Sequence, residues 1–421
     1  MSRRDLWSLG GRVLWNLLAG WRGREAHRSL GTFLRHYAPD HLTPRTPDEV
    51  RLLPAWEACV NCGLCTARCP VLRALLGAEG RYAGPRQVAT SLSRALPEAW
   101  AAHDTIYTCT LCGACEAVCP MGVPIPDLVA SLRRAIALQE VQDAAQYVPP
   151  AHRALVRNLR ERGNIFGQDL PPWPRRERAE YVFFVGCAFS YWERESVAAT
   201  MALLQHLGVD FTPVDEVCCG GPTPVVGLPA VEPLAQRNLA AFDAAGTRKV
   251  ITACPRCALT LRTHPAYRGL EVWHTTQVLA ERSDRLPPGL VEGAVTFHDP
   301  CELARGLGEV GAPRQVLARV GKAASEMEAC REHTDCCGGG GGVRGAFTRL
   351  AVRMARARLE AAMATGAEVL LTECPTCLHN FHNARRSRDA VEVHNLSEYL
   401  ALRLNLAPRP GEGAEASGPQ P

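Results

Sequence analysis

The amino-acid sequence predicts an α+β multidomain protein in which a helical N-terminal module precedes a duplicated α/β domain. Three observations favour this organisation. Two compact runs of cysteines lie before residue 121, short apolar runs alternate with amphipathic stretches from residue 181 onward, and the order of these elements recurs from about residue 294. Because alternating β and α elements build a parallel sheet covered by helices, the C-terminal half is expected to contain two such units.

The composition narrows the classes of function. Of the 421 residues, 47% are hydrophobic and 21% charged, and the formal net charge is only +4. Acidic and basic residues are interleaved along the chain, so no groove for nucleic acid is indicated and we expect no nucleic-acid partner. No run approaches the ~18 apolar residues that a membrane-spanning helix requires.

Cysteine is the unusual residue of this chain. There are 19, an odd number, and most stand in CxxC groups instead of being scattered as disulfide-forming pairs would be. Thiols grouped in this way usually bind metal and must stay reduced to do so, which favours a cytoplasmic location.

Residues 1–48 are predicted to form an amphipathic helical segment. Apolar residues recur at three- and four-residue steps from Leu6 to Trp21 with arginines around them, and no signal-peptide cleavage site follows. We expect this helix to pack on the body of the protein or on a partner subunit. The alternative is a peripheral contact of residues 5–21 with the inner face of the cytoplasmic membrane.

The two cysteine runs share one spacing. Residues 59–70 read CVNCGLCTARCP and residues 109–120 read CTLCGACEAVCP, both of the form C-x2-C-x2-C-x3-C-P. This is the ferredoxin run for a cubane [4Fe-4S] cluster, and in two-cluster ferredoxins the fourth cysteine of each run binds the other cluster. The predicted ligand sets are Cys59, Cys62, Cys65 and Cys119 for one cubane, and Cys69, Cys109, Cys112 and Cys115 for the other. Zinc bound by the same thiols is the alternative, and the duplicated spacing argues against it.

Residues 49–140 are therefore predicted to form a helical 4Fe-4S ferredoxin domain. The segment between the two runs contains helical stretches such as PRQVATSLSRALPEAW and is too long for a compact bacterial ferredoxin. It resembles the helical ferredoxin domain of succinate dehydrogenase. Gly63 and Gly113 follow the second cysteine of each run and are expected to allow the backbone to turn tightly. A linker over residues 141–180, rich in proline and arginine at its end, is expected next.

The C-terminal half is expected to divide into two repeats, residues 181–290 and 291–405, followed by a disordered tail at 406–421. The first repeat is predicted to contain strands at 181–186, 209–214 and 249–253, a further strand ending at His274, and helices at 191–207 and 231–245. In the second repeat the same order recurs, with strands in the stretches AVTFHDPC, EVLLTECPTC and VEVHNLSEYL. Helices are predicted near 313–320 and 345–365, with a short strand between them.

Each repeat carries five cysteines in the same order, one alone, then an adjacent pair, then a CPxC group. They are Cys187, Cys218, Cys219, Cys254 and Cys257 in the first repeat, and Cys301, Cys336, Cys337, Cys374 and Cys377 in the second. The lone cysteine and the first cysteine of each CPxC group follow predicted strands, at the edge where open α/β sheets hold ligands. The five thiols of each repeat are therefore expected to converge on one site, and five exceed what a zinc site or a single cubane uses.

The pattern C-x(30–36)-CCG-x(34–36)-CPxC, present twice, resembles the cysteine-rich CCG domain of heterodisulfide reductases. The same domain occurs in the iron–sulfur subunits of glycolate, lactate and anaerobic glycerol-3-phosphate dehydrogenases. Together with the ferredoxin module, residues 50–405 are similar in layout to the D subunit of heterodisulfide reductases. The resemblance implies one or two further [4Fe-4S] clusters, of a non-cubane type, at the CCG sites, each held by the five cysteines of its repeat.

The resemblance also implies a function. In heterodisulfide reductases the CCG-bound clusters cleave a disulfide in two one-electron steps, and the ferredoxin clusters supply the electrons. Our first hypothesis makes the CCG site catalytic toward a disulfide or a related sulfur substrate. The second makes the chain an electron-relay subunit of a flavin-dependent 2-hydroxyacid (glycolate or lactate) or glycerol-3-phosphate dehydrogenase that passes electrons to quinone. A zinc-loaded structural scaffold is the third.

A redox partner is expected under either of the first two hypotheses. The sequence contains no flavin or nicotinamide motif, so no flavin or NAD is expected in this chain. The expected partner is a flavoprotein dehydrogenase, or a membrane cytochrome b or other quinone-reactive subunit.

The stretch DCCGGGGGV, residues 335–343, is the densest of these motifs. It lacks the Lys-Ser/Thr of a phosphate-binding loop, and a vicinal disulfide would require an oxidised form without a cluster. We expect the glycines to leave room between the chain and the iron. Because the second repeat is the richer in glycine, its five cysteines are the predicted catalytic set, and those of the first repeat are predicted to bind a cofactor.

A few polar residues near the sets are further candidates. His298, beside Asp299, and the strand-end residues His274 and His394 could tune a cluster or pass protons, although a structural role is the favoured interpretation. Cys330 fits no motif and is expected to be an ordinary buried thiol.

Overall fold

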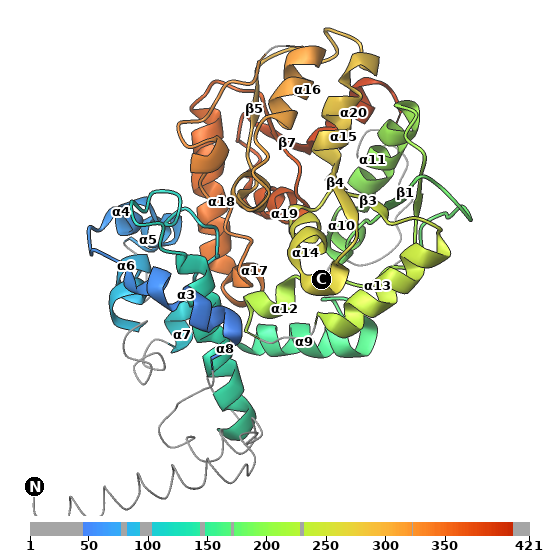
Figure 1. The fold of residues 1–421 in the computed structure, drawn as a ribbon. Coiled ribbons are helices and arrows are strands. Elements are labelled where there is room, and N and C mark those ends of the chain that lie inside the picture. The colour runs from blue at the N-terminus through green and yellow to red at the C-terminus, as the bar shows by residue number, and fades with distance from the viewer. Residues whose placement is uncertain are drawn as a thin grey trace, which may run out of the picture.

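The computed structural model describes residues 45–76, 82–92, 103–143, 148–169, 172–227, 231–321 and 323–406. The predicted amphipathic helix at 5–21 and nearly all of the predicted tail lie outside these residues. Figure 1 shows a helical N-terminal module beside a larger body that contains the strands. Within the described ranges, no helix is both long enough and apolar enough to cross a membrane.

The N-terminal module consists of short helices around the two cysteine runs. They are α3 (Pro47–Glu57), α4 (Leu64–Arg68), α5 (Pro70–Leu75), α6 (Pro85–Gln87), a π-helical turn η2 (Val88–Leu92), α7 (His103–Ile106) and α8 (Ile125–Asp143). Thr46 and Glu49 form a capping box at the start of α3, which fixes where that helix begins. Trp56, Tyr107 and Val129 are buried in the core of the module.

The segment 141–180, predicted as a linker, contains the helix α9 (Pro150–Arg162). Pro150 is its first residue and Gly163 ends it in the left-handed conformation, which is the usual asymmetry of helix ends. The prediction missed this helix because its mean composition is polar. Only His152, Val156 and Leu159 are buried, and they face other parts of the protein.

Each repeat forms its own parallel sheet. The strand order of the first is β2–β1–β3–β4, with β1 (Tyr181–Phe183), β2 (Phe211–Pro213), β3 (Lys249–Thr252) and β4 (Glu271–His274). The order of the second is β5–β6–β7, with β5 (Val295–Phe297), β6 (Val369–Thr372) and β7 (Glu392–Asn395). All pairings are parallel, which confirms the predicted fold class.

Helices connect and cover the strands. Those of the first repeat are α10 (Cys187–Trp192), α11 (Arg194–His206), α12 (Pro222–Val225), α13 (Glu232–Ala244), α14 (Pro255–Thr263) and α15 (Thr275–Glu281). Those of the second are the π-helical turn η6 (Glu302–Gly306), α16 (Ala312–Val320), α17 (Val343–Ala346), α18 (Thr348–Met363), α19 (Pro375–Ala384) and α20 (Leu396–Arg403).

Three details differ from the prediction. The expected single helices at 191–207 and 345–365 are each broken, at Glu193 and Phe347, where the backbone leaves the helical region. The short strand expected in the second repeat between α16 and α17 does not form within the described residues. A single hydrogen bond from Ser325 N to Val295 O, 2.8 Å, stands where the counterpart of β2 would pair with its neighbour.

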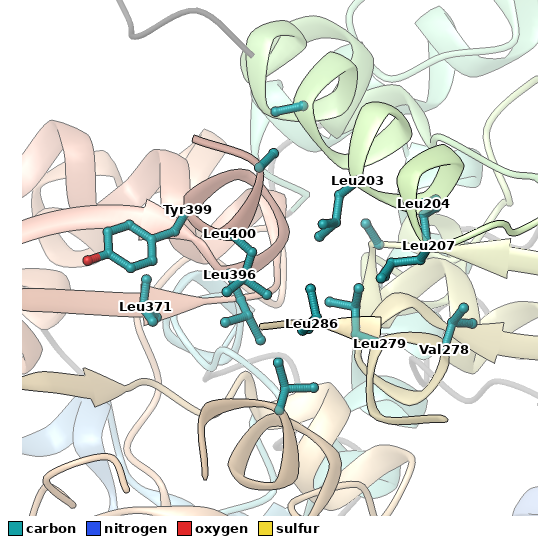
Figure 2. Close-up of a cluster of buried hydrophobic side chains, with 14 of the residues drawn as sticks. Leu203, Leu204, Leu207, Val278, Leu279, Leu286, Leu371, Leu396, Tyr399 and Leu400 are labelled. Carbon is teal, nitrogen blue, oxygen red and sulfur yellow. The ribbon is translucent and has the colours of Figure 1, made fainter. Parts of the chain in front are cut away.

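The two repeats share one hydrophobic core. Helix α11 of the first packs on α20 of the second, and α15 of the first packs on α16 of the second. Because α11 corresponds to α16 and α15 to α20, the two contacts at the interface are equivalent. Figure 2 shows leucines from both repeats meeting there, including Leu203, Leu279, Leu371, Leu396 and Leu400. Burying a leucine side chain stabilises a fold by about 1.5–3 kcal/mol, so this core joins the repeats into a single body.

The glycine run of repeat 2 lies directly against the second cysteine run. A Cβ atom on Gly341 would stand 2.7 Å from the Cα of Thr110, and one on Gly340 would stand 2.9 Å from the carbonyl oxygen of Thr110. His152 of α9 contacts the glycine run as well, and its Nε2 lies 2.9 Å from the Gly342 carbonyl oxygen. These glycines therefore bring three backbone segments into contact, a constraint different from the proximity to iron that the sequence suggested.

This contact predicts an unequal effect of two glycine substitutions. Gly341→Ala should destabilise the protein by about 2–4 kcal/mol, since the methyl group meets backbone atoms that cannot move aside. Gly366→Ala is the matched control, because Gly366 has a similar positive φ of 74° but no atom within 4 Å of a Cβ. It should cost only about 1 kcal/mol. Urea unfolding of both variants measures the difference, and equal losses would contradict a tight contact.

Candidate functional site

The four thiols expected to hold the first cubane lie together at the surface of the N-terminal module. Cys59, Cys62, Cys65 and Cys119 line one small cavity. Cys62 is exposed and Cys65 is buried, so the set has one side open to solvent. The loop bends at Asn61 and Gly63, which both have positive φ, of 59° and 84°.

The second run repeats this local shape. Leu111 and Gly113, on either side of Cys112, have φ values of 54° and 75°. Burial, together with the nearby Cys109 and Cys112, raises the pKa of Cys69 to about 12. Burial also raises the pKa of Cys115, with Cys112, Cys109 and Cys69 adding to the effect. The four cysteines expected to share the second cubane are therefore neighbours in space.

The five cysteines of repeat 1 form a continuous series of thiol contacts. Cys218 contacts Cys187 and Cys219, Cys219 contacts Cys257, and Cys257 contacts Cys254. Hydrogen bonds from Cys218 and Cys257 hold the pKa of Cys219 well below its usual value. All five side chains are buried.

Repeat 2 has the same series in the same order. Cys301 contacts Cys336, Cys336 contacts Cys337, Cys337 contacts Cys377, and Cys377 contacts Cys374. Hydrogen bonds from Cys336 and Cys377 lower the pKa of Cys337 to about 5. The structure thus brings together both predicted sets of five, and the second cysteine of each adjacent pair accepts from two neighbours.

The local sequence explains why the CPxC cysteines face the site. Cys254 and Cys374 are the N-cap residues of α14 and α19, and the proline after each is the first residue of the helix. Proline suits that position because its missing N–H would have no partner there. The second cysteine of each group, Cys257 or Cys377, then falls in the first helical turn.

The donors at both sites are suited to an iron–sulfur cluster. All five side-chain donors are sulfur, the ligand type that soft metal centres prefer, and five thiols exceed the four that tetrahedral zinc takes. Backbone N–H groups also point to the sulfurs, from Gly221 to Cys219 at 3.4 Å and from Gly338 to Cys336 at 3.3 Å. Such bonds stabilise negative charge on sulfur.

All five thiols of repeat 1 and four of repeat 2, those of Cys301, Cys337, Cys374 and Cys377, line one cavity of about 970 Å³. Residues from α9, α10 and α19 line it, together with the glycine run. Two of the lining charges, Arg256 of repeat 1 and Glu302 of repeat 2, form an ion pair that crosses from one repeat to the other.

The second cysteine run contacts the repeat-2 set directly. The Cys112 thiol lies within hydrogen-bonding reach of the Cys336 thiol. Arg305 reinforces the contact by donating from Nε to the Cys112 carbonyl oxygen at 2.6 Å. Arg68, next to the end of the first run, pairs with Asp335 at 2.6 Å. Both cysteine runs are therefore tied to the segment that carries Cys336.

The three candidate histidines differ in their surroundings. His274 caps α15 and its Nδ1 lies 2.8 Å from the hydroxyl of Thr276, while His394 reaches Glu392 at 3.4 Å, and these contacts favour the structural interpretation for both. His298 is fully buried, neither ring nitrogen has a hydrogen-bond partner among the described residues, and one lies within 4.8 Å of the sulfurs of Cys337 and Cys377.

Other expectations need correction or addition. Cys330 is partly exposed, near Glu326, instead of being buried. Asp299, beside His298, forms a buried ion pair with Arg314. The sequence analysis missed the polar residues of the cavity wall, among them Glu193, Arg344 and His379, because no spacing links them. His379 stands two residues after the last CPxC cysteine, and this closeness to Cys377 was the one feature of the sequence that could have indicated a place in the cavity wall.

Comparison with known proteins agrees with this arrangement. Residues 181–262 and 295–382 match the cysteine-rich CCG domain, and residues 55–123 match the 4Fe-4S dicluster domain. A crystal structure of a hypothetical protein from Helicobacter pylori aligns with a TM-score of 0.50 and 9% identity, over 89% of this chain and 76% of the other, which bears on the fold alone.

Several curated relatives resemble most of the chain. The D subunit of the dihydromethanophenazine:CoB–CoM heterodisulfide reductase of Methanosarcina barkeri is 29% identical, over 83% of this chain and 94% of the relative. The B subunit of the CoM/CoB fumarate reductase of Methanothermobacter marburgensis is 29% identical, over 89% and 78%. The EtfAB:quinone oxidoreductase of Syntrophomonas wolfei is 28% identical, over 82% and 57%. The chain therefore belongs to the family of CCG-domain iron–sulfur proteins that resemble the D subunit of heterodisulfide reductases, and it is an electron-transfer subunit of that family.

Proposed function

We propose that this chain reduces a disulfide, or a related sulfur substrate, in the cavity between its two CCG sites. The observation that carries the proposal is that all five thiols of repeat 1 and four of the five thiols of repeat 2 line this one cavity. The contact between Cys112 and Cys336 supports it further, because Cys336 belongs to the set whose other four thiols line the cavity. A subunit that only relayed electrons would need no such space between its last two redox sites.

The proposal assigns each cysteine set to a cluster. The two sets of the N-terminal module would hold two [4Fe-4S] cubanes, and the sets of repeats 1 and 2 would hold one further [4Fe-4S] cluster each, of a non-cubane type. When bound, the clusters supply one-electron transfer, and cleavage of a disulfide consumes two electrons and two protons and yields two thiols. The chain's own residues bind the substrate and exclude bulk water, since the thiols of both repeats are almost all buried.

A partner subunit would exchange electrons with the chain at the first cysteine run. Cys62 is exposed there, and the apolar side chains of Val60, Leu64 and Met121 are 60%, 51% and 48% exposed around it. Exposed apolar side chains around a redox site are suited to a transient protein contact. We propose a flavoprotein or a quinone-reactive membrane subunit as this partner, which would place the chain in the cytoplasm or against the inner face of the membrane.

The alternative is an electron-relay subunit of a flavin-dependent 2-hydroxyacid or glycerol-3-phosphate dehydrogenase. The same exposed patch favours it, because a flavoprotein could dock there. Co-purification of a flavoprotein with no thiol response at the CCG sites would support the relay over the reductase.

Metal analysis of the anaerobically purified protein tests the cluster assignment. Four filled sites predict about sixteen iron atoms per chain and an EPR signal that changes when a thiol is added. About eight iron atoms would mean that only the cubanes are present and would contradict the substrate site. Zinc without a visible chromophore would rule out both redox functions.

Cys337→Ser should remove the cluster of repeat 2 and its chemistry while leaving the ferredoxin module intact. We expect a loss of about four iron atoms and of disulfide reduction with reduced methyl viologen as electron donor. Cys330→Ser is the matched control, since Cys330 belongs to neither five-thiol set. An equal loss of activity in both variants would argue against a catalytic role of the repeat-2 set.

His298→Phe should lower the reduction potential of the repeat-2 cluster. Phe184 occupies the equivalent position of repeat 1, three residues before Cys187, so repeat 2 has an imidazole within 4.8 Å of the sulfurs of Cys337 and Cys377 where repeat 1 has an apolar ring. A hydrogen bond to sulfur stabilises the reduced state and raises the potential. EPR-monitored redox titration of this variant and of Phe184→His, which should shift the other cluster upward, measures the effect. Unchanged potentials in both variants would show that His298 is structural.

A further inference from the structure

We propose that Arg344 is the anchor for a negatively charged oxygen group, such as a carboxylate, on the substrate of the cavity. This inference rests on the proposed function, since it concerns the same cavity, and it adds the chemical class of the substrate, an anionic thiol or disulfide. Arg344 lies in α17, directly after the glycine run, and lines the same cavity as thiols of both repeats.

The guanidinium of Arg344 has a buried donor without an acceptor. Its Nε is buried and has no hydrogen-bond partner among the described residues, and no ion pair is formed by Arg344 within the same ranges. Burial lowers the pKa of this guanidinium, which reflects the cost of keeping the charge away from water. A buried donor without an acceptor is unfavourable, so a ligand oxygen that fills the position recovers this cost on binding.

A second group of residues holds Arg344 in place. Arg344 Nη2 lies 3.5 Å from His379 Nε2, and His379 Nδ1 lies 3.4 Å from Glu193 Oε1. With the proton of His379 on Nδ1, donated to Glu193, the Nε2 lone pair accepts from Arg344. The ring of His379 also stacks on Trp192, with centroids 4.3 Å apart and planes at 6°. Glu193 and His379 are therefore positioning residues for Arg344.

The other charges of the cavity wall are already paired. Arg256 is bound by Glu302, and Glu193 faces two histidines, His379 and, at 3.7 Å, His382. Neither carboxylate is left to neutralise Arg344. Among the charged residues described in the wall, Arg344 is thus the one with donors available to a ligand.

The anchor also depends on both repeats. Trp192 and Glu193 come from α10 and the bend after it in repeat 1, whereas Arg344 and His379 come from α17 and α19 of repeat 2. The anionic group would bind where the repeats meet, and the rest of the molecule would occupy the cavity lined by the thiols.

Two small thiols that differ in charge test the inference. We would titrate the oxidised holoprotein anaerobically with 3-mercaptopropionate and with 2-mercaptoethanol and follow the thiol-dependent change of the EPR signal. The carboxylate thiol should act at about ten-fold lower concentration than the neutral one, a difference of about 1.4 kcal/mol. Arg344→Gln should abolish this preference, and Arg344→Lys should retain part of it.

The control variant is Arg349→Gln, which removes the same charge from an exposed position on α18 outside the cavity wall. It should keep the wild-type preference, and all variants should keep the wild-type iron content, which shows that they fold and load. If the two thiols change the EPR signal of the wild type at equal concentrations, Arg344 is not an anchor, and the proposed disulfide chemistry is unaffected. No response to either thiol would overturn the proposed function, and the anchor with it.

Discussion

The arrangement of the redox sites depends on one buried cation, Arg133 of α8. Its guanidinium is inaccessible to solvent and donates to the carbonyl oxygens of Cys109 at 2.5 Å, Val225 at 2.8 Å and Gly341 at 2.9 Å. These oxygens belong to the second cysteine run, to repeat 1 and to the glycine run of repeat 2. Three buried acceptors from distant segments are satisfied by one side chain, and each would otherwise cost about 1–3 kcal/mol. The contact between Cys112 and Cys336 follows from this junction, because the carbonyls of Cys109 and Gly341 share the same donor.

Duplication made the two repeats alike in fold, while local changes made their sites different. The order of thiol contacts is the same in both, and each repeat packs its first long helix against the last helix of the other. Only repeat 2, however, presents a glycine run to the ferredoxin module, and His298 replaces Phe184 beside its sulfurs. The two sites therefore differ although the repeats share one fold. The repeat that contacts Cys112 is also the repeat that has the imidazole of His298 beside its thiols. This asymmetry supports a distinct role for the repeat-2 set.

Most of the metal-binding architecture could be predicted from the sequence because it is encoded locally. The turn around Cys62, the start of α14 at Cys254 and the strand before it are each specified by a few neighbouring residues and by parallel-sheet geometry. Helix α9 was missed because its apolar residues are few and meet partners far away in the chain. Arg344 was missed for a related reason: its relation to Glu193 exists only after the repeats dock, and no spacing rule joins residues on opposite sides of an interface.

The cysteine motifs are set by local sequence, whereas the cavity wall forms only when the repeats pack together, and this difference bears on how such a chain would select its substrate. Under the proposed cluster assignment the cysteines fix where electrons can arrive, and relatives similar to most of this chain carry names as different as a heterodisulfide reductase, a fumarate reductase and a quinone oxidoreductase. Selectivity must then come from residues outside the cysteine pattern. In this chain the cavity wall balances Arg256 with Glu302 and turns Glu193 toward histidines, which leaves Arg344 as a cation without a counterion among the described residues. A wall in which all charges but one are internally paired would discriminate by charge, since a neutral molecule would leave the buried Nε of Arg344 without an acceptor and an anionic one would supply it.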